Sequence, residues 1–349
     1  MKKIQTNEIS GEAKVSLKKR VITAIILTLI CVPCIILGKW FFLALVFVVS
    51  GLAAYELVNV IGLKGKYRTF VYVTSIIFML MLTFWSYIYR VVVNISSTPT
   101  VLTLKDLESL VFDATDEVGV FYNIAISITV LLIGAGVYFF ISLVDEDFTV
   151  PRASYLIAMN VIVSLCLQAI LYLRYIPGSV FDVSSYAHSS EGPFLDYLWS
   201  AFLIIYVVLG TIVNDIGAYF VGMLFGKNKL NERISPKKTW EGFVGGVVFS
   251  FAISATFAFV CAACKTPIHP KLQLENWYWI VILSLGIPLF ANLGDFSFSN
   301  IKRSFGIKDF SNILPGHGGI LDRIDSLLFT SAFVAVMLIF ISKEFVIFA

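Results

Sequence analysis

The sequence predicts an all-α, polytopic integral membrane protein with about nine transmembrane helices. Of its 349 residues, 58% are hydrophobic and 14% are charged, and the mean hydropathy is +0.88. An average soluble domain has roughly 45–50% apolar and about 25% charged residues, so this chain has too few polar side chains to cover a water-facing surface. The net charge of +3 gives no sign of the clustered basic face of a nucleic-acid-binding protein, and no nucleic-acid partner is expected.

Nine stretches are long and apolar enough for a helix that crosses the hydrocarbon core, which takes about 20 residues. They are residues 21–38, 40–61, 69–89, 119–144, 153–175, 198–225, 242–264, 278–297 and 324–348. The first follows three basic residues, as in a signal peptide, but its apolar run exceeds the usual length of about 7–15 residues and no small-residue cleavage site follows. We therefore expect a basic cytoplasmic segment over 1–20 and a single polytopic membrane domain over 21–349.

The distribution of Lys and Arg predicts which ends of the helices face the cytoplasm, because cytoplasmic loops carry the excess. With the N-terminus inside, 19 of the 26 Lys and Arg residues fall on the inner side. The inner segments are residues 1–20, 62–68, 145–152, 226–241 and 298–323. An odd number of spans then places the C-terminus outside, together with an acidic loop at 95–118 and a polar loop at 176–197, for which no role is predicted.

Four aspartates lie in spans near the predicted cytoplasmic boundary. Asp215 interrupts the sixth span, Asp295 lies in the last turn of the eighth, and Asp322 and Asp325 open the ninth on one helix face. A charged residue within a span costs about 2.5–3.5 kcal/mol to insert, so each is a candidate functional residue. Carboxylates that converge there would repel one another unless a cation lies among them, and hard oxygen ligands with water nearby suit Mg²⁺.

A different interpretation pairs these acids with basic residues of the inner loops as helix-end charges. It suits Asp322 and Asp325, because acids in a first helical turn interact favourably with the helix dipole. It explains Asp295 poorly, because an acid in a last turn opposes that dipole. Glu56, midway along the second span, is a further intramembrane acid, and no partner for it is predicted.

The inner loops carry basic residues and a glycine-rich turn. Residues 226–242 read GKNKLNERISPKKTWEG, and four more basic residues follow within 299–325. The turn PGHGG at 315–319 ends three residues before Asp322, so its amides and the start of the ninth helix are expected to face an anion. His317 either contacts a phosphate or caps the turn. Carboxylates for a metal, basic groups for phosphates and a glycine turn at a helix start are together typical of a phosphoryl- or nucleotidyl-transfer site.

Longer stretches of this region resemble one family. Residues 299–325 read SNIKRSFGIKDFSNILPGHGGILDRID, which is similar to the signature of phosphatidate cytidylyltransferases, also called CDP-diacylglycerol synthases. The segments DIGAY at 215–219 and SPKKTWEG at 235–242 resemble two further parts of that family. One position departs from the pattern: the residue before the signature serine is often acidic in the family and is Phe298 here.

The resemblance implies that CTP and phosphatidate react to give CDP-diacylglycerol and pyrophosphate, dependent on Mg²⁺ and with a second cation left open. It also implies a homodimer and a site that opens to the cytoplasm, and it places the catalytic region within residues 198–330. Asp295 and Asp322 would hold the metal and, with Lys308 and Arg323, form the catalytic group. The other candidates, for substrate binding, are Asp215, Lys237, Lys238, Ser299, Lys302, Arg303, His317, Gly318, Gly319 and Asp325.

Two alternatives stay open at the level of sequence. An ion-coupled transporter would also use intramembrane carboxylates, but its polar residues should be spread through the membrane depth rather than gathered at one edge. A related CTP-dependent lipid kinase, or a cytidylyltransferase with another lipid acceptor, would keep similar chemistry. The short basic N-terminal segment favours a bacterial plasma membrane over the endoplasmic reticulum.

Overall fold

The structure, a computed structural model, describes residues 11–97, 119–175 and 193–341, and within these ranges nine helices are long and apolar enough to cross a membrane. The loop at 98–118, most of the loop at 176–197 and the first ten residues lie outside the described part. The helices are α1 (Gly11–Leu37), α2 (Lys39–Val60), α3 (Arg68–Ser97), α5 (Gly119–Val144), α6 (Val150–Arg174), α8 (Pro193–Phe225), α9 (Trp240–Ala263), α10 (Trp277–Ser304) and α11 (Leu321–Ile341). The prediction of an all-α polytopic membrane protein is confirmed.

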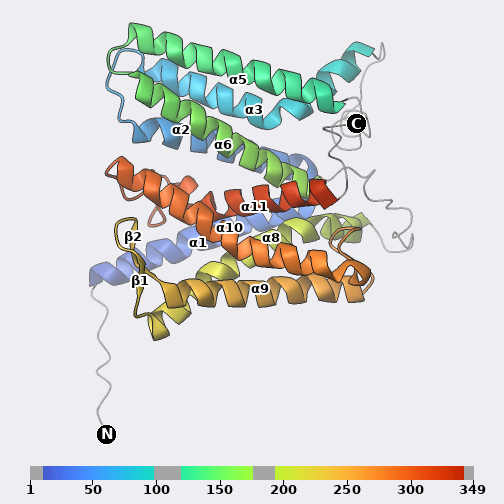
Figure 1. Cartoon of the computed structure of the whole chain (residues 1–349). Helices are drawn as coiled ribbons and strands as arrows, with labels where there is room; N and C mark the ends of the chain where they lie inside the picture. The colour runs from blue at the N-terminus through green and yellow to red at the C-terminus, as the bar shows by residue number, and fades with distance from the viewer. Residues whose placement is uncertain (1–10, 98–118, 176–192, 342–349) are drawn as a thin grey trace.

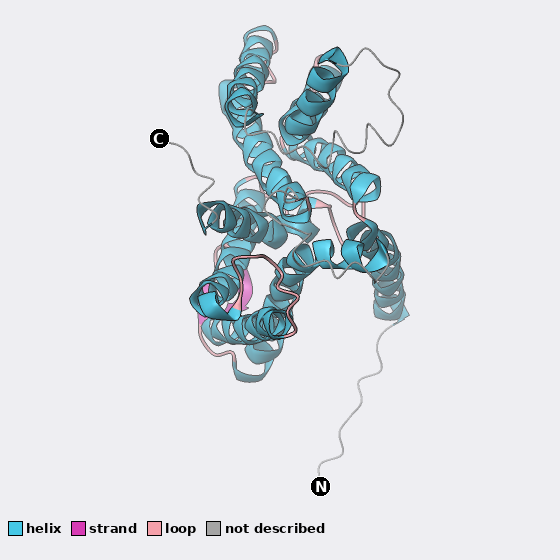
Figure 2. Cartoon of the chain, turned by 90° about the vertical axis from the view of Figure 1, so that its right-hand side faces the viewer, coloured by secondary structure: helices cyan, strands magenta, loops and turns pink. Residues whose placement is uncertain are grey.

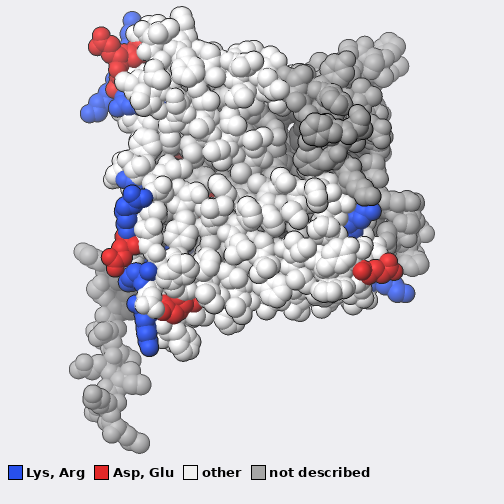
Figure 3. Space-filling view, viewed as in Figure 1, with Lys and Arg blue, Asp and Glu red and all other residues white. Residues whose placement is uncertain are grey.

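The helices lie side by side and share two polar edges. The loops between α2 and α3, between α5 and α6, and between α10 and α11 all reach the left-hand edge in Figure 1, which also holds the short strands β1 and β2. Charged side chains gather at this edge and, less densely, at the opposite one, with an uncharged band between them (Figure 3). Figure 2 views the molecule from the opposite edge, with the helices pointing roughly toward the reader. The predicted inner segments therefore share one end of the bundle.

Several helix boundaries differ from the predicted spans, two of them beside the predicted acids, and one element was not predicted. α10 continues to Ser304, beyond the predicted end at 297, and α11 begins at Leu321, before the predicted start at 324. The inner loop 226–239 contains an antiparallel hairpin of β1 (Lys229–Asn231) and β2 (Ser235–Thr239). Its turn forms because the side chain of Asn231 accepts hydrogen bonds from the amides two and three residues later.

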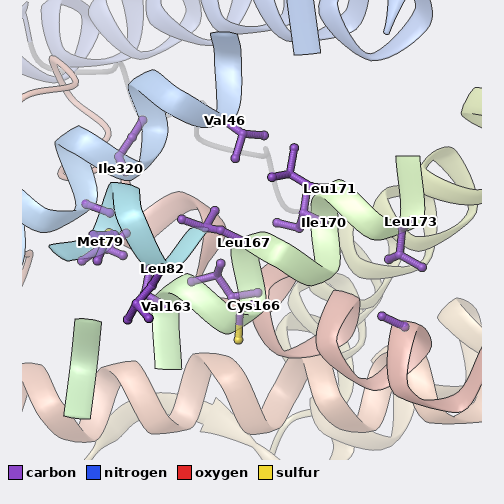
Figure 4. Packing of buried hydrophobic residues seen from close by; sticks show 14 of the residues in the cluster. Val46, Met79, Leu82, Val163, Cys166, Leu167, Ile170, Leu171, Leu173 and Ile320 are labelled. Carbon is purple, nitrogen blue, oxygen red and sulfur yellow. The ribbon is translucent and has the colours of Figure 1, made fainter. Parts of the chain in front are cut away.

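An apolar cluster joins α2, α3 and α6, as Figure 4 shows from close by. Ile320, at the start of α11, also belongs to this cluster, so the first half of the chain packs directly against the segment that precedes the predicted acids of the ninth span. The labelled members are Val46, Met79, Leu82, Val163, Cys166, Leu167, Ile170, Leu171, Leu173 and Ile320.

Glycines allow the backbones of α8 and α9, and of α10 and α11, to approach closely. A Cβ placed on Gly246 of α9 would lie 2.7 Å from the carbonyl oxygen of Asn214, and one on Gly242 would lie 2.7 Å from that of Ala218. A Cβ placed on Gly294 of α10 would lie 2.5 Å from the carbonyl oxygen of Asp325. Such small-residue contacts are a common way to pack membrane helices. Here they bring α8 against α9, and α10 against α11, close to the acidic residues.

Candidate active site

Three helices bring the predicted carboxylates together at the inner side of the bundle. Asp215 comes from α8, Asp295 from α10, and Asp322 and Asp325 from the first turns of α11. Asp215, Asp295 and Asp325 are close enough to interact electrostatically with one another. The tight crossing at Gly294 explains part of this arrangement, because the residue that follows this glycine is Asp295 and the backbone that it touches is that of Asp325.

Asp295 lies inside its helix, nine residues before Ser304, and not in the last turn as the sequence led us to expect. The argument that it opposes the helix dipole is therefore wrong. Its carboxylate forms an ion pair with Lys238 of β2 and accepts a hydrogen bond of 3.2 Å from the Ser299 hydroxyl. The side chain of Asp295 is 26% exposed, so it remains reachable from solvent.

Asp322 is almost fully enclosed, with a side chain that is 2% exposed. One carboxylate oxygen accepts a 2.8 Å hydrogen bond from the ammonium group of Lys302. The other accepts two backbone hydrogen bonds of 2.9 Å, from the amides of Phe310 and Gly319. This differs from the expected role as a metal ligand facing a site, because three protein donors already occupy its oxygens. Asp322 here ties the loop after α10 to the start of α11.

Lys302 sits between two acids. Its ammonium nitrogen is 2.8 Å from an oxygen of Asp322 and 3.9 Å from an oxygen of Asp325, and its side chain is 10% exposed. Lys302 and Lys238 thus provide the ion pairs that the helix-end interpretation expected. Lys302 was also expected to hold a phosphate, but in this arrangement it neutralises buried carboxylates.

At the start of α11, amides that were expected to face an anion donate to protein oxygens. Gly319 donates its amide to Asp322, and the amides of Ile320 and Leu321 donate to Glu56. Gly318 donates to the carbonyl of Leu314 within the turn. Protein oxygens accept both the Gly318 and the Gly319 amide here, and the use of these amides for phosphate binding stays a prediction.

His317 lies within this turn and is half-buried. Its backbone amide donates to the carbonyl of Leu314, which closes the turn. The ring nitrogen Nδ1 has no hydrogen-bond partner among the described residues. The turn also needs glycine at two positions, since Gly316 and Gly318 have φ angles of 77° and 82°.

Several of the predicted basic residues are exposed at the predicted cytoplasmic edge. Lys237, Lys308 and Arg323 are exposed, and Arg323 interacts electrostatically with Asp215. Arg303 is exposed but engaged, because it donates to the carbonyls of Ile234, in the hairpin turn, and of Ile307. Three of these four predicted phosphate-binding residues therefore present charge to solvent, while Arg303 fastens the hairpin to α10.

Two residues that sequence reasoning missed connect the helices of the site. The side chain of Asn292 in α10 donates to the side chain of Asn214 in α8, at 3.0 Å, and Asn214 in turn donates to Asp215 at 3.3 Å. Asn292 is three residues before Asp295, so both face the same side of α10. The signal that could have identified them in the sequence is a polar amide side chain inside an apolar span.

Phe298, at the position that departs from the family pattern, is buried against the rings of Phe310 and Phe329.

Two of the acids have the oxygen ligands that a magnesium ion would need if it also bound a substrate. Within the described residues no three His, Cys, Asp or Glu side chains form a ready metal cage. Mg²⁺ in nucleotide sites commonly takes only one or two carboxylates, with phosphate oxygens and water as its other ligands. Asp295 and Asp325 supply such oxygens from two helices that cross at Gly294.

Comparison with known proteins agrees with this site. The profile of the cytidylyltransferase family matches residues 18–341. The chain belongs to the cytidylyltransferase family. It is therefore a nucleotidyltransferase, and the ion-coupled transporter considered above is not favoured.

Several relatives of this family member come from bacteria. A protein from Bacillus subtilis (strain 168) named phosphatidate cytidylyltransferase is 28% identical over 324 residues, which are 93% of this chain and 98% of that protein. Proteins of the same name from Staphylococcus haemolyticus (strain JCSC1435) and Staphylococcus aureus (strain COL) are 36% identical over 176 residues and 37% over 177. Each of these two matches covers 50% of this chain and 59% of the relative.

Proposed function

We propose that this protein transfers CMP from CTP to phosphatidate, giving CDP-diacylglycerol and pyrophosphate at the cytoplasmic edge of a bacterial plasma membrane. The observation that carries the proposal is the meeting of carboxylates from α8, α10 and α11 with exposed basic side chains at one end of a transmembrane bundle, in a chain of the cytidylyltransferase family. The names and sources of the relatives support the acceptor and the membrane.

Charge repulsion is the main obstacle to this reaction. A phosphate oxygen of the lipid is already anionic near neutral pH, so it needs no strong general base to attack the α-phosphorus of CTP. The new bond joins that oxygen to the α-phosphorus, and the bond to the β-phosphate breaks to release pyrophosphate. Lys308, Arg323 and Lys237 would reduce the repulsion between the two anions and align them, because all three present positive charge to solvent and Arg323 interacts electrostatically with Asp215.

Mg²⁺ would be held by Asp295 and Asp325, and it supplies positive charge to the nucleotide phosphates and the leaving pyrophosphate. To bind the metal, Asp295 would have to release Lys238, and Asp322, the other ligand proposed from the sequence, would have to release Lys302. Lys238 and Lys302 hold the carboxylates together before substrates bind, since each pairs with an acid that would otherwise repel its neighbour.

The surroundings of Asp215 suit a lipid acceptor. This acid is exposed on a face of α8 whose other members, Ile212, Ile216 and Tyr219, are exposed and apolar or aromatic. A lipid lying against that face can keep its acyl chains in hydrocarbon while its phosphate reaches the acids and bases at the inner edge. We also propose a homodimer, as the family resemblance implies, which the mass of the protein in detergent will test.

The deciding experiment supplies the purified protein in detergent with CTP, phosphatidate and Mg²⁺ and follows two labels. Label in the cytosine ring should enter the lipid phase, whereas label in the γ-phosphate should stay in water as pyrophosphate. Asp295→Asn should abolish the transfer, and Glu275→Gln, an exposed acid at the opposite edge, should not. Entry of the γ-phosphate label into the lipid phase without cytidine would refute the proposal and indicate a lipid kinase.

A further inference from the structure

Glu56 is a completely buried acid in α2 that takes no part in the chemistry described above. Its carboxylate accepts three hydrogen bonds from one segment more than 250 residues further along the chain. One oxygen accepts from the Ser311 hydroxyl at 2.6 Å and from the Ile320 amide at 2.7 Å, and the other from the Leu321 amide at 2.9 Å. The intramembrane acid without a predicted partner therefore binds the loop that precedes α11.

The position of this carboxylate suits the charge at the start of α11. The first amides of a helix have no acceptor within the helix, and the helix dipole puts partial positive charge there. Glu56 accepts hydrogen bonds from two of these amides, and all three of its partners act as donors, as is typical of an ionised carboxylate. The three hydrogen bonds and the positive end of the helix dipole compensate the buried negative charge. A glutamine side chain at this position carries no charge and would form weaker hydrogen bonds.

The fit also depends on a glycine. A Cβ placed on Gly319 would lie 2.6 Å from an oxygen of Glu56 and 2.8 Å from its carboxyl carbon. Only a residue without a side chain lets the carboxylate reach the amides that follow. A second helix of the N-terminal half contacts the same turn, because the Thr23 hydroxyl of α1 donates to the carbonyl of Pro315 at 2.9 Å.

The amides bound by Glu56 directly precede Asp322, and Asp322 positions other charged residues of the site. Asp322 accepts from Lys302, and Lys302 lies 3.9 Å from Asp325. A shift of the backbone at 320–321 would therefore move Asp322, and with it Lys302 and the carboxylates that Lys302 neutralises. We infer that Glu56 is a positioning residue for the transfer reaction: by capping α11 from α2, it sets the place of the signature loop and of Asp322. This inference rests on the proposed function only for its effect on rate.

The test compares Glu56→Gln with Ser50→Ala in the purified full-length protein. Ser50 is a matched control, because it is a fully buried polar residue of the same helix whose hydroxyl donates to Val46 within that helix. For Glu56→Gln we expect kcat to fall about 10–100-fold, since a misplacement near 1 Å costs about that much, while the KM for CTP stays near that of the wild type. Hydrogen–deuterium exchange should accelerate in peptides covering residues 319–322. Ser50→Ala should change neither.

Three outcomes would overturn the inference: a wild-type kcat in Glu56→Gln, a fall in kcat without faster exchange at 319–322, or equal changes in Ser50→Ala. If Glu56→Gln does not fold, Ser311→Ala removes only one of the three hydrogen bonds, and it must show a smaller change of the same kind in both measurements. Should the wild-type protein make no CDP-lipid, the proposed function fails, whereas the exchange measurement still decides whether Glu56 caps α11.

Discussion

The crossing of α10 and α11 at Gly294 predicts that one added methyl group will disrupt the site. In Gly294→Ala, the new Cβ would lie 2.5 Å from the carbonyl oxygen of Asp325, 3.1 Å from Cβ of Phe329 and 3.2 Å from Cα of Ser326. Two of these three atoms belong to the backbone, so no flexible side chain can move away. Ordinary contacts begin at 3.4 Å, and the helices must therefore separate by about 0.9 Å.

That separation can be converted into expected changes in stability and rate. Forcing an extra methyl group into a packed interior costs about 1–3 kcal/mol, which should lower the melting temperature in detergent. Because Asp295 and Asp325 lie on the two sides of the crossing, their carboxylates move apart by a similar distance. A displacement of this size costs about 10²-fold in rate when it affects reacting groups, so the rate of CMP transfer from CTP should fall by about that factor.

Gly136→Ala provides the control for this measurement. Gly136 also lies inside a transmembrane helix, α5, but a Cβ placed there meets no atom within 4 Å. This variant should keep the wild-type rate, and its melting temperature should not fall, since alanine favours a helix more than glycine does. If Gly294→Ala transfers CMP at the wild-type rate and melts at the wild-type temperature, the close crossing does not position the acids and the reasoning is refuted.

Three other substitutions test separate parts of the structure. Asp322→Asn breaks a buried ion pair, which costs about 3–5 kcal/mol, so it should lower the melting temperature and abolish CTP turnover; wild-type turnover would contradict this. Arg323→Ala should raise the KM for CTP or phosphatidate without a change in melting temperature, and unchanged kinetics would remove Arg323 from substrate binding. The pKa of Asp147 is lowered from 3.8 by the Lys64 amide and by Arg152. The ionised Asp147 therefore stabilises the fold at neutral pH, and this stabilisation is lost as the pH falls through the lowered pKa. The melting temperatures of Asp147→Asn and the wild type should differ at pH 7 and converge in acid, and a pH-independent difference would disprove this.

The membrane spans, and the set of loops that share one end of the bundle, could be predicted from sequence because both depend on local composition. Hydropathy over about 20 residues decides whether a helix can cross lipid, and the count of Lys and Arg in each loop decides the side. The end of α10 was placed too early for the same reason. Residues 298–304 are more polar, so the apolar pattern stops at 297, but the helix continues to Ser304, out of the apolar part of the chain.

The identity of the site residues was also accessible, whereas their partners were not. Four acids and several basic residues could be named from their positions in spans and loops. Which basic residue forms an ion pair with which acid depends on how the helices cross, and no local sequence pattern predicts that crossing. Lys238 reaches Asp295 through an unpredicted hairpin, and Lys302 reaches Asp322 because α10 extends further than expected. The partner of Glu56 is the extreme case, since it comes from more than 250 residues away.

The use of the amides at the start of α11 constrains how the nucleotide is bound. Gly319, Ile320 and Leu321 donate to the carboxylates of Asp322 and Glu56. A phosphate that took these amides would leave a buried carboxylate without its donors, and an uncompensated buried charge costs several kcal/mol. We therefore propose that exposed Lys and Arg side chains, together with the proposed metal, hold the triphosphate, rather than the backbone amides at the start of α11. Because exposed charges are screened by salt, the KM for CTP should then rise with ionic strength.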